Sequence, residues 1–368
     1  MEYEAVIYER DGAVARITLN RPEKRNAQNS QMISELDDAM RRAARDDEVN
    51  VIVLGGAGSS FSSGHDHKEV MRDPVVSGLR SEMTTRVALE REMYLEKCLA
   101  IRDIPKPTIA MVQGPCIAAG VMLAAMCDLI AASDDAVFRD PTLDMGGGGA
   151  AAVEVLYHPW DFGARRAKRF LFFGEELTAA EALELGFVSW VFPRDELEAR
   201  TMELAHTLAS RPPGPIRMVK RSINQTLDRM GQRDSFEYHF VMHCAHAVVR
   251  GMVERGWGRI IAISSDAGRI GVPELSTYAA GKAGAAGFLR SLAKEVGQSG
   301  VTCNVVSLGL IPGPWMAEET RERRARQFPV GRVGVPQDVP GAVVWLASDE
   351  ASWVTGQTIS VNGGYLII

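Results

Sequence analysis

The last third of the chain carries the strand pattern of a parallel sheet, and this pattern restricts the fold more than any other feature. Three apolar runs, RIIAISS, VTCNVVSL and TISVNGG, alternate with helical stretches, the longest at Ser276–Gly297. Strands that alternate with helices indicate a layered α/β architecture. The same segment sets out a hydroxyl, a phenol and an amine at Ser265, Tyr278 and Lys282, the last two one helical turn apart. No glycine-rich strand–helix turn precedes these strands, so the first 250 or so residues form a different kind of protein.

Composition sets the class of protein. A chain of 368 residues suits two domains, and contents of 46% hydrophobic and 24% charged residues are those of an ordinary globular protein. The net charge of −6 gives no electrostatic reason to expect a nucleic-acid or membrane partner. Five cysteines without a CxxC pair favour reduced thiols, and the N-terminus reads as a hairpin instead of a signal peptide. We therefore expect a cytoplasmic protein.

The first 250 residues alternate strands and helices. Met32, Leu36, Met40 and Ala43 recur at helical spacing, ahead of the buried strand VNVIVLGG. A charged helix, roughly residues 81–102, should end at DIPKP, before the strand TIAMVQG, a short apolar helix and the strand LIAAS. Three helices follow Pro193. We place the domain junction near residue 250, and because no Gly/Ser or Pro-rich linker marks it, we expect a continuous helix and closely packed domains.

Two loops carry the chemical signal. The first, GGAGSSFSSGHDHKEV, follows a strand, and its partial GxGxxF match is too incomplete for a dinucleotide loop. The second, VQGPCIAAGVMLAAMCD, runs from a strand into a helix through small residues. Small residues let the backbone approach a ligand, and free N–H groups at a helix start favour negative charge. Two such loops can aim two N–H groups at one oxygen, which suits an enolate forming on a thioester carbonyl.

Motifs in this segment resemble one known family. RPEKRNAQN, FSSGHDHKE, PKPTIAMVQG…AAG…CDLIAASDDAVF and TAAEALELGFVSWVFP are similar, in order and spacing, to the crotonase (enoyl-CoA hydratase/isomerase) superfamily. The resemblance implies a ββα spiral with C-terminal helices, a trimer or dimer of trimers, and no cofactor beyond the coenzyme A of the substrate. It implies that the backbone N–H groups of His65 and Ala119 form the oxyanion hole. It also implies that coenzyme A is held by Lys24, Arg25, Ala27, Ser63 and Asp66.

The departures from that family concern its acid/base residues. Met122 and Thr142 stand where the hydratases have two glutamates, and neither side chain moves a proton. Ala119 replaces the usual oxyanion glycine, which is tolerable if the backbone there does not need a positive φ. The candidate replacements for the proton-transfer residues are Asp140, Glu154 and His158. Asp140 could equally form a turn before proline, and Glu154 could simply favour a helix first turn.

The HDH triplet at residues 65–67 could suggest a metal site. No third ligand lies at a sensible spacing, so we expect no metal.

The segment from Met252 onward resembles the C-terminal half of the short-chain dehydrogenases/reductases. The resemblance implies that Tyr278 is a general acid, that Lys282 lowers its pKa and that Ser265 positions a carbonyl. The pyrophosphate-binding turn and the acidic ribose reader are missing, and Leu308-Gly309 replaces the family's Pro-Gly. We therefore expect a vestigial triad that does not bind NAD(P). The lost strands leave an open edge beside RIIAISS, which the other domain, another subunit or a strand exchange must cover.

The sequence thus predicts a crotonase-like acyl-CoA domain at residues 1–250 and a truncated dehydrogenase-like fragment at residues 251–368, a partial doubly wound sheet of three strands. The expected function is that of an enoyl-CoA hydratase/isomerase-family enzyme, a lyase or isomerase with non-standard acid/base residues. Three alternatives stay open: a non-catalytic acyl-CoA binder or scaffold, a C–C bond hydrolase of the same superfamily, and an NAD(P)-dependent oxidoreductase completed in trans.

Overall fold

The structure is a computed structural model that describes residues 3–66, 68, 88–143, 155–313 and 316–367, with the backbone alone for 241, 244–248, 250 and 277. The chain forms two compact units, Met1–Gln232 and Arg233–Ile368. Glu154 lies outside the described residues. Among the described helices, none combines the length and the apolar character needed to cross a membrane.

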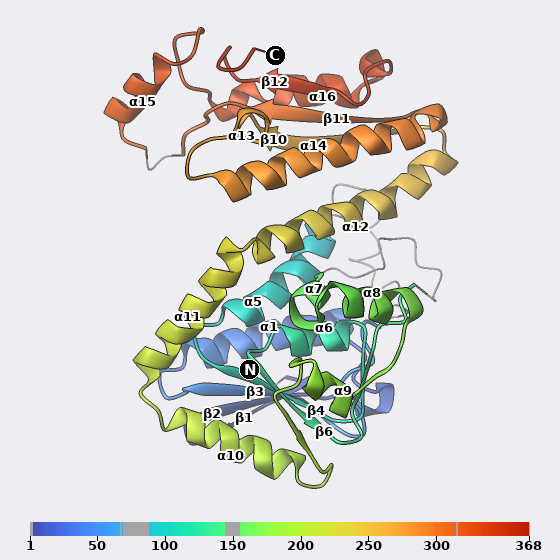
Figure 1. Ribbon diagram of the computed structural model, residues 1–368, viewed down its shortest axis with the longest axis vertical. Helices are drawn as coiled ribbons and strands as arrows, with labels where there is room; N and C mark the ends of the chain where they lie inside the picture. The colour runs from blue at the N-terminus through green and yellow to red at the C-terminus, as the bar shows by residue number, and fades with distance from the viewer. Residues whose placement is uncertain (1–2, 67, 69–87, 144–154, 314–315, 368) are drawn as a thin grey trace. The chain divides into compact units, whose positions relative to one another are not determined.

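The first unit is built on a six-stranded sheet with the strand order β1-β2-β3-β4-β6-β9 (Figure 1). The first two strands form the expected hairpin and pair antiparallel, whereas the others pair in parallel. The bounds are β1 Val6–Asp11, β2 Val14–Leu19, β3 Val51–Gly56, β4 Thr108–Val112, β6 Leu129–Ser133 and β9 Trp190–Phe192. A smaller sheet contains β5 Pro115–Ile117, β7 Val137–Arg139 and β8 Leu177–Thr178.

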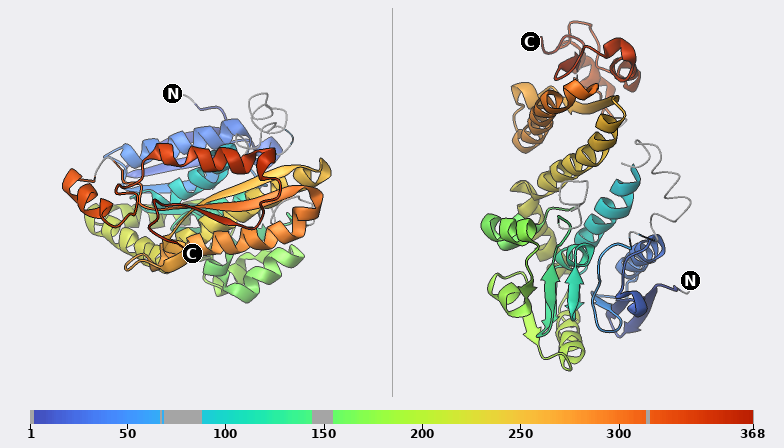
Figure 2. Two further views of the ribbon diagram at one scale, coloured as in Figure 1. Left: turned by 90° about the horizontal axis from the view of Figure 1, so that it is seen from above. Right: turned by 90° about the vertical axis from the view of Figure 1, so that its right-hand side faces the viewer.

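Helices cover both faces of the large sheet (Figures 1 and 2). Helix α10 packs on one face, where Leu197 and Ala205 meet Val51 and Val53 of the central strand β3. Helix α1 lies on the other side. The helices of this unit are η1 Pro22–Lys24, α1 Ser30–Arg45, η2 Arg91–Glu96, α5 Lys97–Asp103, α6 Ala119–Ala125, α7 His158–Phe162, α8 Ala164–Phe173, α9 Ala179–Glu184, α10 Leu197–Ala209 and α11 Pro213–Arg229.

The predicted periodicity of α1 is confirmed. Met32, Leu36, Met40 and Ala43 are all buried. The helix starts where it does because the side chain of Asn29 accepts a hydrogen bond from the N–H of Met32, a cap worth about 1 kcal/mol. Since four apolar positions at 3.6-residue spacing are buried, this helix packs into the core of the unit through one face.

Charged side chains cap the C-terminal end of α1 and hold α11 against the rest of the unit. The ammonium of Lys106 donates to the carbonyls of Ala43 and Asp46 at the end of α1, and burial lowers its pKa. Helix α11 has no buried residue of its own. It is held by two ion pairs, Lys220 with Asp128 at 2.7 Å and Asp228 with Arg102 at 2.8 Å.

The second unit contains a parallel sheet with the order β10-β11-β12, as the three apolar runs predicted. Figure 2 shows α14 and α16 on opposite faces of this sheet, which is the layering of a partial doubly wound fold. The elements are α12 Gln232–Glu254, β10 Gly258–Ser265, α13 Ala267–Ile270, α14 Ser276–Val296, η3 Gly297–Ser299, β11 Val301–Leu308, α15 Glu318–Ala325, η4 Pro336–Asp338, α16 Pro340–Ala347, η5 Asp349–Ala351 and β12 Thr358–Val361.

Helix α12 runs without a break through residue 250, where we placed the domain junction. The boundary at that residue and the close packing of the two domains both stay predictions.

Candidate active site in the first unit

Two turns, one after β3 and one before α6, meet at Gly64. Ser62 and Cys116 form a parallel bridge, and the N–H of Ile117 donates to the carbonyl of Ser62. Gly64 has a φ of +88°, and a Cβ placed there would lie 3.1 Å from the carbonyl oxygen of Ile117 and 3.4 Å from the nitrogen of Ala119. This position therefore needs glycine for its backbone conformation and for its close approach to the second turn.

The second turn presents the N–H of Ala119 at the start of α6. Ala118 has φ +48° and ψ −116°, its N–H donates to the carbonyl of Arg139, and its carbonyl accepts from Val121 and Met122. Because Ala119 is the first helical residue, its N–H has no partner within the helix. The positive φ falls on Ala118 and leaves Ala119 in a helical conformation, so alanine is tolerated where the family has glycine.

His65 lies on the first turn, in a parallel bridge with Gln28. The N–H of Gln28 donates to the carbonyl of Gly64, and the N–H of Asp66 donates to the carbonyl of Gln28. Since the backbone groups on either side of His65 face Gln28, the N–H of His65 itself points the other way. Its ring lies 4.3 Å, centroid to centroid, from the ring of Tyr94.

The predicted coenzyme A residues gather on the loop before α1 and on the first turn. The N–H of Ser63 donates to the carbonyl of Arg25, and its hydroxyl donates to the carbonyl of Lys24. Buried Asn26 binds the carbonyls of Ala57 and Ser60 and holds the loop from within. The structure thus brings Lys24, Arg25, Ala27 and Ser63 together. Their contact with coenzyme A stays a prediction.

Asp66 has a role within the protein that the sequence did not indicate. The guanidinium of Arg21 contacts its carboxylate at 3.2 Å and donates to the carbonyl of Ala27 at 2.6 Å. Both ionic side chains are mostly buried, with 11% and 14% exposed. Arg21 therefore holds the loop before α1 against the first turn. The arginine at the start of the RPEK stretch was the one sequence feature that could have indicated this ion pair.

Asp140 lies beside the second turn. Ile117 pairs with Arg139 in the β5–β7 register, and the N–H of Ala118 donates to the carbonyl of Arg139, so the next residue, Asp140, is next to the turn. Asp140 is buried, and burial raises the pKa of its carboxyl group. Thr142 donates to Oδ1 through its hydroxyl at 2.6 Å and its N–H at 3.2 Å. Oδ2 accepts no hydrogen bond from the described residues.

His158, the third candidate, is fully buried among aromatic rings. Its ring stacks on Tyr157 at 3.9 Å and lies 5.6 Å from Phe170. Glu154, four residues before His158, is outside the described residues, so its role beside His158 stays a prediction.

Two ionisable residues of the YHPWDF stretch, Tyr157 and Asp161, were missed in the sequence analysis. Burial raises the pKa of Asp161 to about 7. Tyr157 is buried, and its hydroxyl has no hydrogen-bond partner among the described residues. Burial raises the pKa of Tyr157 well above its ordinary value, and the charges of Asp140, Cys116 and Asp161 raise it further. The acidic residue inside the aromatic stretch YHPWDF was the available signal.

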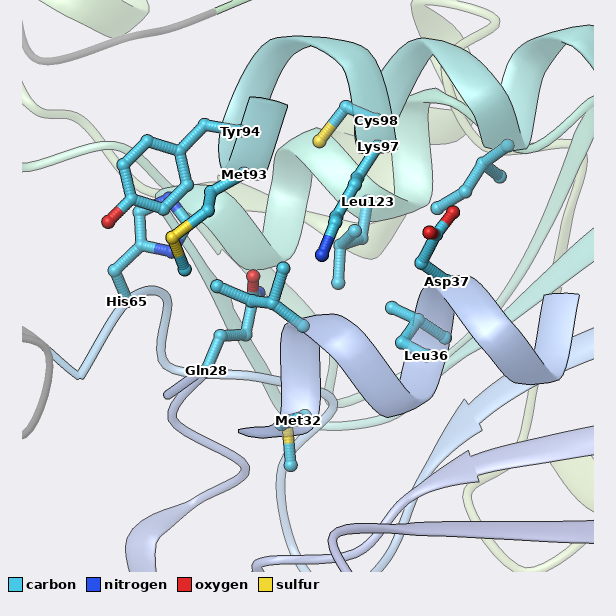
Figure 3. A pocket seen from close by; sticks show the side chains of 12 residues that line it. Gln28, Met32, Leu36, Asp37, His65, Met93, Tyr94, Lys97, Cys98 and Leu123 are labelled. Carbon is cyan, nitrogen blue, oxygen red and sulfur yellow. The ribbon is translucent and has the colours of Figure 1, made fainter. Parts of the chain in front are cut away.

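An apolar pocket opens beside His65 (Figure 3). It lies between α1, the η2–α5 segment and α6, and its cavity volume is only about 20 Å³, enough for roughly one water molecule. Met32, Leu36, Met93 and Leu123 supply most of its wall. Asp37 and Lys97 are polar groups at its lining. Its lining is mostly apolar, but its volume is far below that of a typical small-molecule site.

In the second unit, Ser265 ends β10, and Tyr278 and Lys282 lie in the first two turns of α14. The ammonium of Lys282 donates to the carbonyl of Ile263 at 3.3 Å and lies 5.6 Å from the ring centroid of Tyr278. The hydroxyl of Ser265 accepts from the N–H of Ala267. The side chain of Tyr278 is 45% exposed.

The fold and the paired turns define a crotonase-type protein, and comparison with known proteins gives the same class. A family model described as enoyl-CoA hydratase/isomerase matches residues 9–248, and the chain belongs to that family. A second model, described as enoyl-(acyl carrier protein) reductase, matches residues 206–366, which confirms the resemblance of the C-terminal segment to a reductase.

Relatives extend over the first unit. EchA13 of Mycobacterium tuberculosis, a protein named for the enoyl-CoA hydratases, is 39% identical over 260 residues, which is 66% of this chain and 80% of the relative. A structure from Mycobacterium smegmatis named for the same activity is 43% identical, covering 70% of this chain and 99% of that one with a TM-score of 0.62. A Xanthobacter autotrophicus enoyl-CoA hydratase/isomerase structure is 33% identical, covering 69% and 94%, with a TM-score of 0.61. The expected crotonase-family enzyme is confirmed.

Proposed function

We propose that the first unit binds an acyl-CoA thioester and stabilises its enolate with the N–H groups of His65 and Ala119. The observation that carries this proposal is the close approach of the two turns at Gly64, where a Cβ would lie 3.1 Å from the carbonyl oxygen of Ile117 and crowd the second turn. Two preorganised N–H donors act on the oxygen where negative charge develops. The names of the relatives, enoyl-CoA hydratases and isomerases, support an acyl-CoA substrate.

Asp140 moves the proton in this proposal. Its carboxylate takes the proton from the carbon next to the thioester carbonyl, and the electron pair of the broken C–H bond moves onto the carbonyl oxygen. The enolate then reacts onward, and the carboxylic acid returns its proton. A buried carboxyl group with a raised pKa is a stronger base once ionised and keeps the proton longer for its return.

The test measures proton abstraction itself, since hydration, isomerisation and C–C bond hydrolysis could each follow it. Wild-type protein is incubated with butyryl-CoA in D2O, and loss of the α-proton signal is followed by NMR. We expect Asp140→Asn to slow exchange by about 10²- to 10⁴-fold. Thr142→Ala, which keeps the carboxylate and removes one hydroxyl donor, should stay within about tenfold of wild type because one hydrogen bond is worth about 1 kcal/mol. Exchange that is equally fast in Asp140→Asn removes Asp140 from the mechanism and leaves Glu154 as the next candidate.

A non-catalytic acyl-CoA binder is the second candidate, favoured by Met122 and Thr142 in place of the family's glutamates. It predicts butyryl-CoA binding by calorimetry without exchange in wild type.

For the second unit, we propose that it does not use NAD(P). The absence from the sequence of a glycine-rich turn ahead of β10 supports this, because that turn supplies the anion-binding N–H groups. Titration of NADH fluorescence with the full chain should show no saturable change, and saturable binding would favour the oxidoreductase. A trimer-based assembly and a cytoplasmic location stay part of the proposal.

A further inference from the structure

Strand β10 lies at the edge of its sheet. It pairs with β11 on one side, and among the described residues no strand pairs with the other side. The difference in burial follows from this position. Every residue of β11 except Leu308 is buried, whereas residues 259–262 of β10 are only partly buried and Ile263 is 45% exposed. In the described sheet, β11 therefore has a neighbouring strand on each side, whereas the apolar centre of β10 has one on a single side.

The backbone groups that face the open edge can be identified. The N–H of Asp266 donates to the carbonyl of Leu308 in β11. Since successive residues of a strand point their backbone groups to alternate sides, the even-numbered residues of β10 face β11. The groups of Arg259, Ile261, Ile263 and Ser265 then face the open edge. The bond from Lys282 to the carbonyl of Ile263 agrees with this assignment.

This edge lacks most of the features that protect exposed edges from pairing. Proteins block edge strands with prolines, bulges or outward charges. β10 contains no proline, and its register with β11 is continuous from Gly258 to Ser265. Its one charged side chain, Arg259, is 6% exposed and binds Asp349 at 3.1 Å. The flexible ammonium of Lys282 is the one described side-chain group that bonds to the edge.

We propose that the open edge of β10 pairs antiparallel with β10 of a second copy of this chain, about a two-fold axis at Ala262. In that register Arg259 faces Ser265 of the partner copy and Ile261 faces Ile263, so all four edge-facing residues pair. Each such pair exchanges two hydrogen bonds, which gives about eight across the axis. Registers centred on Ile261 or Ile263 pair only three of the four.

The side chains are also self-complementary in this register. Ile261 and Ile263 lie on the same face of the strand. The two-fold axis therefore places Ile261 of each copy opposite Ile263 of the other, which gives two isoleucine pairs. Cross-strand pairs of β-branched residues contribute roughly 0.2–1 kcal/mol each. The exposed Ile263 becomes covered. Among the bonds of the described residues, only that of Lys282 to the Ile263 carbonyl is lost, and an N–H of the second copy replaces it. A two-fold interface uses the same surface on both copies, so the strand needs no other partner.

The first experiment is a cysteine cross-link in the full chain. At the axis, Ala262 faces its own copy in a non-hydrogen-bonded pair with Cα atoms about 4.5 Å apart, inside the range of a disulfide. We expect Ala262→Cys to give a covalent dimer under mild oxidation, seen on a non-reducing gel. Ile263→Cys is the matched control, because diagonal Cα atoms about 7–8 Å apart are too distant. Residue 263 is more exposed than residue 262, so cross-linking by random collision would be faster for Ile263→Cys than for Ala262→Cys. That result would overturn the proposal.

The second experiment measures the mass of the full chain by analytical ultracentrifugation. Ile261→Pro removes an N–H that faces the open edge and leaves the bonds to β11, and Ile263→Lys adds an edge charge at an exposed position. We expect both variants to have half the mass of wild type. Unchanged mass with full hydrogen-exchange protection of residues 261–265 would show that the chain covers its own edge, and would overturn the proposal.

Discussion

Replacing Gly64 by alanine should separate the two turns of the proposed oxyanion hole. The new Cβ would lie 3.1 Å from the carbonyl oxygen of Ile117, 3.2 Å from the Cβ of Ala118 and 3.4 Å from the nitrogen of Ala119. Two of these neighbours are backbone atoms, so the turn itself must move by a few tenths of an ångström. The left-handed backbone conformation adds about 1–2 kcal/mol for any residue with a Cβ.

Gly186→Ala separates the backbone cost from the crowding. Gly186 has a φ of +78°, close to that of Gly64, and a Cβ there would meet nothing within 4 Å. Both variants should therefore lose about 2–8 °C in Tm from the backbone cost of about 1–2 kcal/mol. Only Gly64→Ala should also displace an oxyanion donor, and losing one such donor slows turnover by about 10²- to 10³-fold.

The assay is α-proton exchange of butyryl-CoA in D2O, with Tm measured by circular dichroism on the same samples. We expect exchange by Gly186→Ala to stay near the wild-type rate and exchange by Gly64→Ala to fall by at least 10²-fold. A folded Gly64→Ala protein that exchanges as fast as Gly186→Ala would refute the reasoning, because the contact between the turns would then have no part in catalysis.

Two further predictions concern charged groups near the site. Because the pKa of Asp161 is raised to about 7 in the folded chain, the unfolded chain ionises first, and the protein loses stability as pH rises from about 4 to 7. Asp161→Asn should remove that loss of stability, which is worth roughly 2 kcal/mol after allowance for partial exposure. Tm of both proteins measured between pH 4 and 7 would detect it. A Tm difference between the two proteins that does not change with pH would contradict the burial argument. Arg21→Met should weaken coenzyme A binding about tenfold in calorimetry with little change in the saturated exchange rate, since Arg21 positions the loop through Ala27 and Asp66. Arg41→Met is the control, because the Arg41 side chain is 54% exposed, and equal losses in both variants would argue against a positioning role.

Local pattern sufficed for the elements with strong periodicity. The four apolar residues of α1 predict a helix buried on one face, and the apolar runs of the second sheet predict buried strands. The structure has that helix and those strands. The charged helix expected over residues 81–102 is helical in its described part, from residue 88 to Asp103, but Arg91–Glu96 form a π-helical turn, where Met93 and Tyr94 pack with Ile33 of α1.

The candidate site was predictable where a motif fixes the backbone and unpredictable where tertiary burial sets the chemistry. The meeting of the turns at Gly64 follows from the glycine and small residues in the two loops. The raised pKa of Asp161 and the isolated hydroxyl of Tyr157 arise from groups brought in by other segments, and no local pattern contains that information. The positive φ at Ala118 in place of Ala119 likewise depends on its bond to Arg139.

Helix α11 has a consequence for the order in which the first unit assembles. Its two ion-pair partners, Asp128 and Arg102, lie in segments before and after β4 in the sequence. The ion pairs of α11 can form only when those segments are in place. A helix without a buried side chain gains little from early collapse. We therefore expect α11 to dock late and to open first, with its amides exchanging while the strands beneath stay closed.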